Sequence, residues 1–376
     1  MKISNNISKK LILIIGLIFL AGCSKPVKND ITEVSDKIDI PKYISISTTS
    51  DYIEPAQSEI NIYDESMKIV DTKQIDSGSY YSYMEKENKM YFFGGKSILS
   101  IDKTSGKLKT FNNIIDKGII ENINNQGDSP LFINNIELTS KNIYNSEIHE
   151  ILDLNDMSQT SFKTNDSLAL DAIKISNKYY VISRTFKDDE NNRALEIYDT
   201  NQSLINEISL DFDSSIYQFY KKNDKLYLIG SASADEKIKI ININEDLTLS
   251  LINELDIDSS EVFIDQSNQE LYILNNSGVH KIDIEQNIVI TIFDTKEFDS
   301  SNQKDNEYAI SAFFGGNGKS LRVIKRSNLE PEKQGEVKTF IQDESKDKFI
   351  VLDKVSIDRD SINKGYMMGI YFGKLN

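Results

Sequence analysis

The stretch Asn-Asp-Lys-Leu-Tyr-Leu-Ile at residues 223–229 decides the fold, because it joins a polar turn to a short apolar strand with a central tyrosine, Tyr227. Asn and Asp favour chain reversal, whereas branched and aromatic residues favour strands. The same combination surrounds Tyr91, Tyr180 and Tyr272. The stretch therefore predicts a β-strand unit that recurs along the chain.

The four tyrosines recur with a period of about 45 residues. They lie 89, 47 and 45 residues apart, and residues 129–133 fill the slot in the first, double-length gap. Similar strands lie one period outward at 43–46 and 318–324. Each marker strand has further alternating strands before and after it, separated by turns rich in Asp, Asn, Ser and Gly. This pattern predicts four short antiparallel strands per repeat.

Four such strands every 40 to 50 residues are typical of a β-propeller blade. We expect an all-β fold, a single propeller of seven four-stranded blades. The units cover residues 43–75, 80–112, 118–155, 170–210, 215–255, 260–293 and 308–353. The first unit lacks its leading strand, and residues 366–372 form an unassigned strand at the end of the chain. We therefore expect this C-terminal strand to pair into the N-terminal blade and close the ring. A large sandwich or irregular β-rich domain is the alternative.

The N-terminus has the three parts of an export signal. Lys2, Lys9 and Lys10 precede the apolar residues 11–20, and small residues follow. The apolar segment is shorter than the roughly 20 residues that a transmembrane helix needs. Residues 1–22 are therefore predicted to be a signal peptide rather than a permanent membrane span.

The residues Leu20, Ala21, Gly22 and Cys23 resemble the lipobox of bacterial lipoproteins. The resemblance implies that Cys23 is lipidated and becomes the first residue of the mature chain. Two acyl chains hold a soluble domain stably at a membrane. We expect residues 23–42 to be a flexible tether and residues 43–376 to be the propeller. An ordinary signal peptide with a chance cysteine is the alternative.

The charge of the chain excludes one class of partner and suggests a location. The net charge is −16, from 43 basic and 59 acidic residues, and loss of three lysines with the signal peptide makes it −19. Such a charge argues against nucleic acid as a partner. Abundant Ile, Asn and Lys indicate an A+T-rich, Gram-positive host. We expect the domain to be lipid-anchored at the cell membrane, facing outside the cytoplasm.

Few residues of the chain form patterns that indicate chemistry. His149 and His280 each stand alone, and no nucleophile, phosphate-binding or dinucleotide motif is present, so no catalytic residue is predicted. Two equivalent acidic loops precede Ser pairs and could supply oxygen ligands to calcium, or could be solvated loops. No other cofactor is expected. The calcium candidates are Asp211, Asp213, Asp256 and Asp258.

Three functions fit these features. The first is a non-catalytic binding or scaffold protein that uses the propeller surface to hold a protein or envelope component. The second is an extracytoplasmic enzyme acting on an envelope glycan. The third, a solute-binding lipoprotein of a transporter, requires long amphipathic helices, and only residues 147–158 resemble one. The resemblance to secreted propeller proteins covers residue 43 to the end and is architectural, so it implies a fold and no activity.

Overall fold

The computed structural model describes most of the chain after residue 32. The described residues are 33–39, 42–48, 58–64, 69–75, 82–115, 119–124, 126, 131–138, 144–164, 167–185, 192–210, 216–231, 237–257, 261–265, 269–275, 278–294, 308–315, 320–327, 335–343, 348–357 and 368–375. All regular elements in these ranges are β-strands, which confirms the all-β prediction. Accordingly, the described part of the chain holds no helix capable of crossing a membrane.

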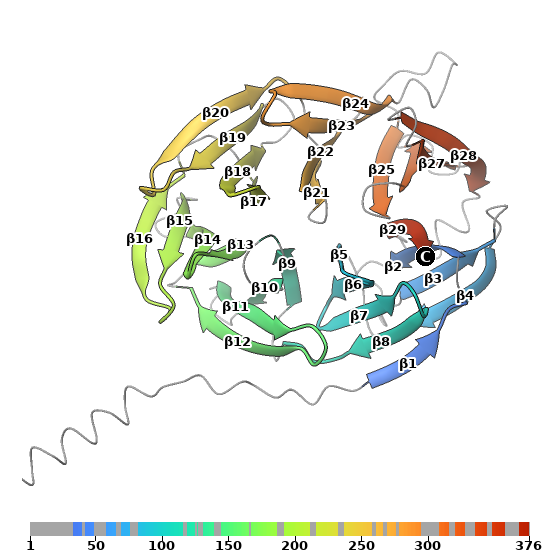
Figure 1. Cartoon of the computed structure of the whole chain (residues 1–376), viewed down its shortest axis with the longest axis horizontal. Coiled ribbons are helices and arrows are strands. Elements are labelled where there is room, and N and C mark those ends of the chain that lie inside the picture. Colours follow the sequence, from blue (N-terminus) through green and yellow to red (C-terminus); the bar gives the residue numbers. More distant parts are fainter. Residues whose placement is uncertain are drawn as a thin grey trace, which may run out of the picture.

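The described strands form seven antiparallel sheets that follow one another around a ring (Figure 1). We number the sheets along the chain and give their strands from the centre of the ring outward. Sheet 1 contains β29 (Met368–Leu375), β2 (Lys42–Thr48), β3 (Ser58–Tyr63) and β4 (Ile69–Ile75); sheet 2 contains β5 (Ser82–Lys86), β6 (Lys89–Gly94), β7 (Ser97–Asp102), β8 (Lys107–Phe111) and β1 (Glu33–Lys37); sheet 3 contains β9 (Ile119–Asn124), β10 (Leu131–Leu138), β11 (Tyr144–Asp153) and β12 (Ser158–Lys163).

The remaining four sheets repeat the same order of strands. Sheet 4 contains β13 (Leu168–Ile175), β14 (Lys178–Thr185), β15 (Asn192–Tyr198) and β16 (Leu204–Ser209); sheet 5 contains β17 (Ile216–Lys222), β18 (Lys225–Ser231), β19 (Ile238–Ile243) and β20 (Leu249–Leu255); sheet 6 contains β21 (Glu261–Asp265), β22 (Glu270–Asn275), β23 (Gly278–Asp283) and β24 (Ile288–Asp294); sheet 7 contains β25 (Tyr308–Gly315), β26 (Ser320–Ser327), β27 (Gly335–Asp343) and β28 (Lys348–Ile357).

The C-terminal strand and the strands of the first repeat meet in sheet 1. Strand β29 pairs antiparallel with β2, from Lys42 opposite Leu375 to Thr48 opposite Met368. The C-terminal strand thus lies where the first sequence repeat lacks its leading strand. It also contacts β25 and β26 of sheet 7.

Two boundaries differ from the sequence expectation, and the one helix-like segment forms strands. Residues 33–37, which the sequence pattern assigns to the tether, form β1 and pair with the outer strand β8. Residues 147–158, the only helix-like segment, lie in β11 and at the start of β12. Strand β12 extends to Lys163, beyond the expected end of the third repeat at residue 155. Sheet context therefore overrides the local helical pattern.

Besides its pairing with β8, strand β1 is held by a backbone hydrogen bond and an ion pair. The Ile38 backbone N–H donates to the Gly106 carbonyl at 2.8 Å, and Lys73 of β4 forms an ion pair with Asp36 at 2.8 Å. Gly106 has φ +69°, and a Cβ there would lie 1.8 Å from the Ile38 carbonyl oxygen. A glycine is therefore required at this turn for β1 to dock.

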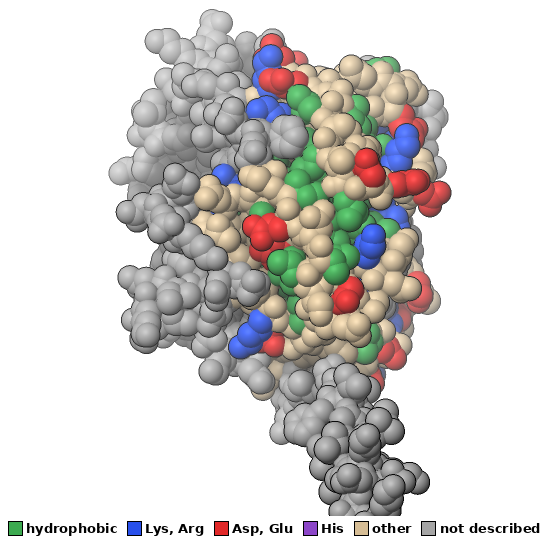
Figure 2. All heavy atoms as spheres, turned by 90° about the vertical axis from the view of Figure 1, so that its left-hand side faces the viewer, with side chains coloured by type: hydrophobic (Ala, Val, Ile, Leu, Met, Phe, Trp, Pro, Cys, Tyr) green, Lys and Arg blue, Asp and Glu red, His purple; other side chains and the backbone are tan. Residues whose placement is uncertain are grey.

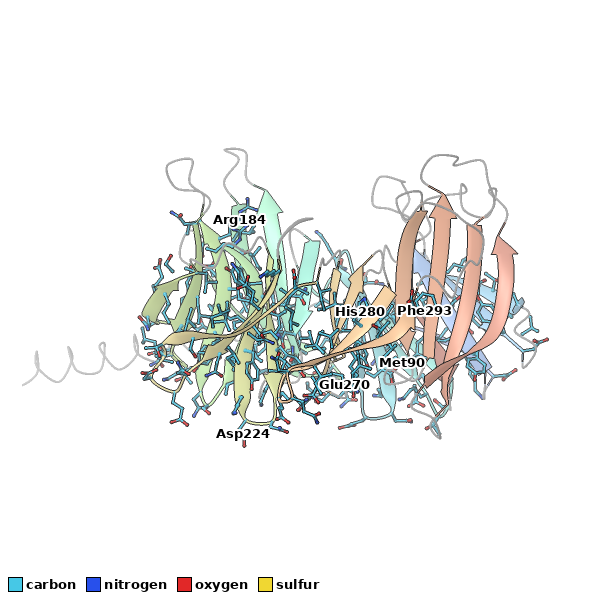
Figure 3. The ribbon with its side chains drawn as sticks, turned by 90° about the horizontal axis from the view of Figure 1, so that it is seen from above. Met90, Arg184, Asp224, Glu270, His280 and Phe293 are labelled. Carbon is cyan, nitrogen blue, oxygen red and sulfur yellow. The ribbon has the colours of Figure 1, made fainter. Side chains whose placement is uncertain are left out.

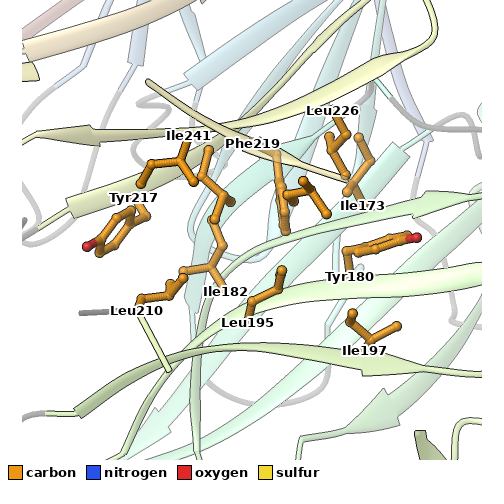
Figure 4. Packing of buried hydrophobic residues seen from close by; sticks show 12 residues of the cluster. Ile173, Tyr180, Ile182, Leu195, Ile197, Leu210, Tyr217, Phe219, Leu226 and Ile241 are labelled. Carbon is orange, nitrogen blue, oxygen red and sulfur yellow. The ribbon is translucent and has the colours of Figure 1, made fainter. Parts of the chain in front are cut away.

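The core consists of apolar clusters between neighbouring sheets rather than one central mass. One cluster joins sheets 4 and 5 and contains Ile182, Leu195 and Phe219 (Figure 4). Similar clusters join sheets 1 and 2, sheets 2 and 3, sheets 3 and 4, and sheets 5 and 6. The marker tyrosines Tyr91, Tyr180, Tyr227 and Tyr272 are all buried, as expected for packing between blades.

The ring has two different faces. The turns between first and second strands lie on one, here called the turn face, such as residues 176–177 and 223–224. The opposite face, here called the crossover face, carries the sheet-to-sheet connections and the hairpins between second and third strands. Figure 3 shows Asp224 on the turn face and Arg184 on the opposite side of the ring.

Acidic residues at the ends of third strands shape the turn face. Asp102 Oδ1 accepts the Ser105 N–H at 2.7 Å, and Asp283 Oδ1 accepts the Glu285 N–H at 3.0 Å. The backbone hydrogen bond from Ser105 lowers the pKa of Asp102. These acids are therefore turn residues, as their positions in the repeat predict.

Candidate functional site

A buried carboxylate lies on the inner side of the ring, where three sheets meet. Asp171 of β13 is 3% exposed. Its Oδ2 accepts the Phe219 backbone N–H of sheet 5 at 2.8 Å, and its Oδ1 accepts the Ala172 N–H at 2.8 Å. Asn124 Nδ2, at the end of β9 in sheet 3, lies 3.2 and 3.3 Å from the two oxygens. One carboxylate thus joins sheets 3, 4 and 5.

Gln126 extends this contact. Its Nε2 donates to the Phe219 carbonyl at 2.8 Å, and its Oε1 accepts the Lys221 N–H at 2.7 Å. The side chain therefore pairs with the edge of β17 as a strand would. We call Asn124, Gln126 and Asp171 the inner clamp.

Burial raises the pKa of Asp171 to about 7, against the hydrogen bonds from Phe219, Asn124 and Ala172, which lower it. A carboxyl group with such a pKa can exchange a proton near neutrality, which is a property of general acids and bases. However, the hydrogen bonds from Phe219 and Asn124 join Asp171 to the two neighbouring sheets. The arrangement therefore holds sheets 3, 4 and 5 together through a carboxyl group that can gain or lose a proton near neutrality.

Other buried acids are paired within the protein. Glu150 of sheet 3 accepts from Lys174 Nζ and from the Tyr179 hydroxyl of sheet 4, both at 2.8 Å. Glu85 forms an ion pair with Lys103 at 2.9 Å. Such partners compensate the cost of burying these charges.

The two histidines lie in strands of different sheets. His149 of β11 and His280 of β23 are buried, and His280 Nδ1 lies 3.1 Å from the Thr291 hydroxyl. Burial lowers the pKa of His280. Both are buried strand residues.

Of the predicted calcium and lipid sites, one residue lies in the described part of the chain. Asp256 is an exposed residue after β20, whereas Asp211, Asp213 and Asp258 lie outside the described residues, as do Leu20, Ala21, Gly22 and Cys23. The described residues contain no group of three or more His, Cys, Asp or Glu side chains placed to hold a metal. The calcium prediction therefore stays a prediction.

The rim of the ring carries a surface that sequence analysis missed. The outer strands of sheets 4, 5 and 6 expose branched aliphatic side chains, 37–50% accessible, and Figure 2 shows apolar side chains along this side of the molecule. We call this set the rim band. Its members are Leu204, Ile205, Leu251, Ile252, Ile288, Val289 and Ile290.

The sequence did hold a signal for the rim band. Adjacent residues of a strand point to opposite faces of its sheet, so a run of adjacent apolar residues places apolar side chains on both faces. The fourth strands contain such runs, Leu204-Ile205, Leu251-Ile252 and Ile288-Val289-Ile290. Asp171 likewise interrupts an apolar first strand, and an acid at such a position is unusual.

Comparison with known proteins supports the fold. No family model matches the chain, and none of the curated proteins matches it. The periplasmic gluconolactonase of Pseudomonas aeruginosa is similar over 89% of this chain and 99% of its own, with 9% identity and a TM-score of 0.50. A quinoprotein alcohol dehydrogenase-like protein of Bacteroides thetaiotaomicron is similar over 95% and 98%, with 12% identity and a TM-score of 0.44. The likeness to the gluconolactonase shows a shared propeller-type fold alone.

Proposed function

We propose that the protein is an extracytoplasmic lipoprotein that binds a protein partner at the rim of a seven-bladed β-propeller. Cys23 anchors it to the cell membrane of a Gram-positive host, and β29 closes the ring by completing the first blade. The seven sheets and the pairing of β29 with β2 support this architecture. The export signal and lipobox residues support the anchor.

The observation that carries the binding role is the rim band. Contiguous exposed aliphatic residues on a soluble domain mark interaction surfaces. Covering a half-exposed Leu or Ile side chain contributes roughly 1 kcal/mol. The band continues over the outer strands of three successive sheets (Figure 1), so a partner could cover several side chains together.

The occupant that fits is an extended strand of another protein. An outer strand has an unpaired edge, and an added strand satisfies its backbone groups. The chain already does this in sheet 2, where β1 pairs with β8, and β8 is largely buried. By contrast, β20 and β24 are exposed along most of their length and end their sheets in the described part of the chain. We therefore assign β20, with its neighbours β16 and β24, as the docking edge.

A charge introduced into the rim band should abolish partner binding. We expect Ile252→Lys to lose a crosslink that the wild-type chain forms in intact cells through a photoreactive residue at Ser250, also exposed on β20. The reason is that a lysine at the centre of an apolar contact must be desolvated. Mass spectrometry of the crosslinked peptide measures whether the partner contributes an extended segment.

Gln74→Lys is the matched control, since it adds the same charge to the exposed outer strand β4. It should leave the crosslink intact. Equal loss in both variants, or a crosslink only between two copies of this chain, would contradict a protein partner at the rim band.

The anchor gives a second prediction. Cys23→Ala should leave the protein unprocessed or release it from the membrane, because the thiol that carries the lipid is gone. Fractionation of cells and the mobility of the mature chain measure this. A normally cleaved variant that stays on the membrane would show that Cys23 is not the anchor.

An extracytoplasmic enzyme acting on an envelope glycan is the second candidate. The observation in its favour is the pKa of Asp171, about 7, at the inner side of the ring. Release of fragments from purified cell-wall glycan by the wild-type protein, and not by folded Asp171→Asn, would put this function ahead of binding.

A further inference from the structure

The outer strands of sheets 1 and 4 begin with the same apolar feature. Strand β4 begins with Ile69 and Val70, and β16 begins with Leu204 and Ile205. In each strand the second of these residues is skipped in the pairing with the third strand, which marks a bulge. A bulge bends its strand and re-aims a side chain. The two skipped residues are exposed to a similar extent, Val70 at 53% and Ile205 at 49%.

These two apolar pairs lie on opposite sides of the ring. Leu204 and Ile205 belong to the rim band, whereas Ile69 and Val70 lie apart from it, and we call the latter two residues the sheet 1 pair. Figure 1 shows β4 on one side of the ring and β16 on the other. Ile69 is also more than half exposed. The sheet 1 pair is therefore a second apolar surface, separate from the rim band.

The strand beside the sheet 1 pair leads to the proposed lipid anchor. Asp36 of β1 forms an ion pair with Lys73 of β4 at 2.8 Å, so these two outer strands are neighbours (Figure 1). Lys73 follows Val70 by three residues, which in a strand span about 10 Å. Cys23 lies ten residues before Glu33, where β1 begins, and ten residues span at most about 33–36 Å. A lipid on Cys23 would thus hold this side of the ring close to the bilayer.

We propose that the sheet 1 pair lies on the outer surface of the membrane, with its aliphatic side chains in contact with lipid. This placement rests on the proposed anchor at Cys23. Exposed aliphatic side chains gain free energy when they leave water for the boundary between headgroups and acyl chains. The tether raises their local concentration at the bilayer, so even two side chains can keep one side of the ring in contact.

The placement also describes the partner of the rim band more closely. With β4 on the bilayer, β16 lies on the side of the ring that points away from it (Figure 1). The rim band is then open to a strand of a protein that approaches from outside the membrane. A segment at the level of the lipid headgroups would lie on the wrong side of the ring.

Quenching of a fluorophore by lipid tests the placement. Cys23 is the one cysteine of the chain, so after its lipidation an introduced cysteine can be labelled alone. The mature lipoprotein is bound to phosphatidylcholine vesicles that contain a lipid spin-labelled in its acyl chain. Neutral lipid is used because Asp71, exposed beside Val70, is repelled by anionic headgroups at low salt. We expect a fluorophore on Val70→Cys to be quenched several-fold more than in vesicles without the spin label.

Ile205→Cys with the same fluorophore is the matched control, since Ile205 is the skipped second residue of its own outer strand on the other side of the ring. It should show little quenching. Adding Ile69→Ser to the chain labelled at residue 70 should lower the quenched fraction about 2- to 5-fold, because the apolar area of Ile69 is lost.

The other outcomes overturn the placement. Equal quenching at residues 70 and 205 would mean that no side of the ring is preferred, and quenching at neither would mean that the sheet 1 pair stays in water. A spectral change at residue 70 that grows with protein concentration in the absence of vesicles would assign the pair to a second copy of the chain. A chain that fails to float with the vesicles would contradict the anchor at Cys23, and the placement with it, whereas a chain that floats without quenching at residue 70 would contradict the placement alone.

Discussion

Deletion of residues 366–376 should abolish cooperative unfolding of the domain. The deletion removes β29, which pairs with β2 over residues 42–48 and contacts sheet 7. It also removes Leu375, which is fully buried in the cluster between sheets 1 and 2. The exposed edge of β2 and the open cluster would favour aggregation. Calorimetry and gel filtration of the mature chain measure both effects.

A smaller change makes the same prediction quantitative. Leu375→Ala should lower the free energy of unfolding by about 2–5 kcal/mol, as for other buried leucines. Ile252→Ala is the matched control, because Ile252 is 50% exposed, and it should change stability by less than about 0.5 kcal/mol. An unchanged melting temperature in the deletion variant would show that the tail does not complete the first sheet.

The repeat made most of the fold predictable from the sequence. Buried tyrosines recur at the equivalent position of four units, and Tyr91, Tyr180, Tyr227 and Tyr272 keep the period visible. The turns are also visible, because an acid such as Asp283 must accept backbone N–H groups there. Both signals come from side chains with a fixed role at a fixed position.

The missed strands lack such side chains. Strand β1 has the sequence EVSDK and is held largely through backbone pairing with β8, which any polar segment can make. Strand β12 reads SQTSFK, and Phe162 is its one apolar residue to indicate a buried face. A tether and an edge strand are therefore alike in composition, and only the partner strand distinguishes them.

The repeat spacing also predicts part of the inner clamp. Asn124, Asp171 and Phe219 are 47 and 48 residues apart, so the inner clamp joins equivalent points of three successive repeats. The spacing predicts that these positions are neighbours, but not that an acid there accepts a backbone N–H from the next sheet.

Replacing Asp171 by asparagine should remove a pH dependence of stability. Burial raises the pKa of Asp171 from 3.8 to about 7 in the folded protein. Between these values the unfolded chain ionises and the folded protein keeps its proton, so the free energy of unfolding falls as the pH rises from about 4 to about 7, and then levels off. A shift of this size corresponds to about 4 kcal/mol. The amide of the Asp171→Asn variant stays neutral at every pH, so the variant should lack this decline.

Urea denaturation of both proteins between pH 4.5 and pH 8 measures the difference. Acids with lowered pKa values, such as Asp36 and Asp102, oppose the decline in both proteins and cancel in the comparison. Asp246→Asn is the control, since Asp246 is an exposed turn acid and its removal should leave the decline in place. Parallel curves for the wild type and Asp171→Asn would mean that Asp171 is ionised in the folded ring. The inner clamp would then be a permanent charge contact rather than a proton-sensitive one.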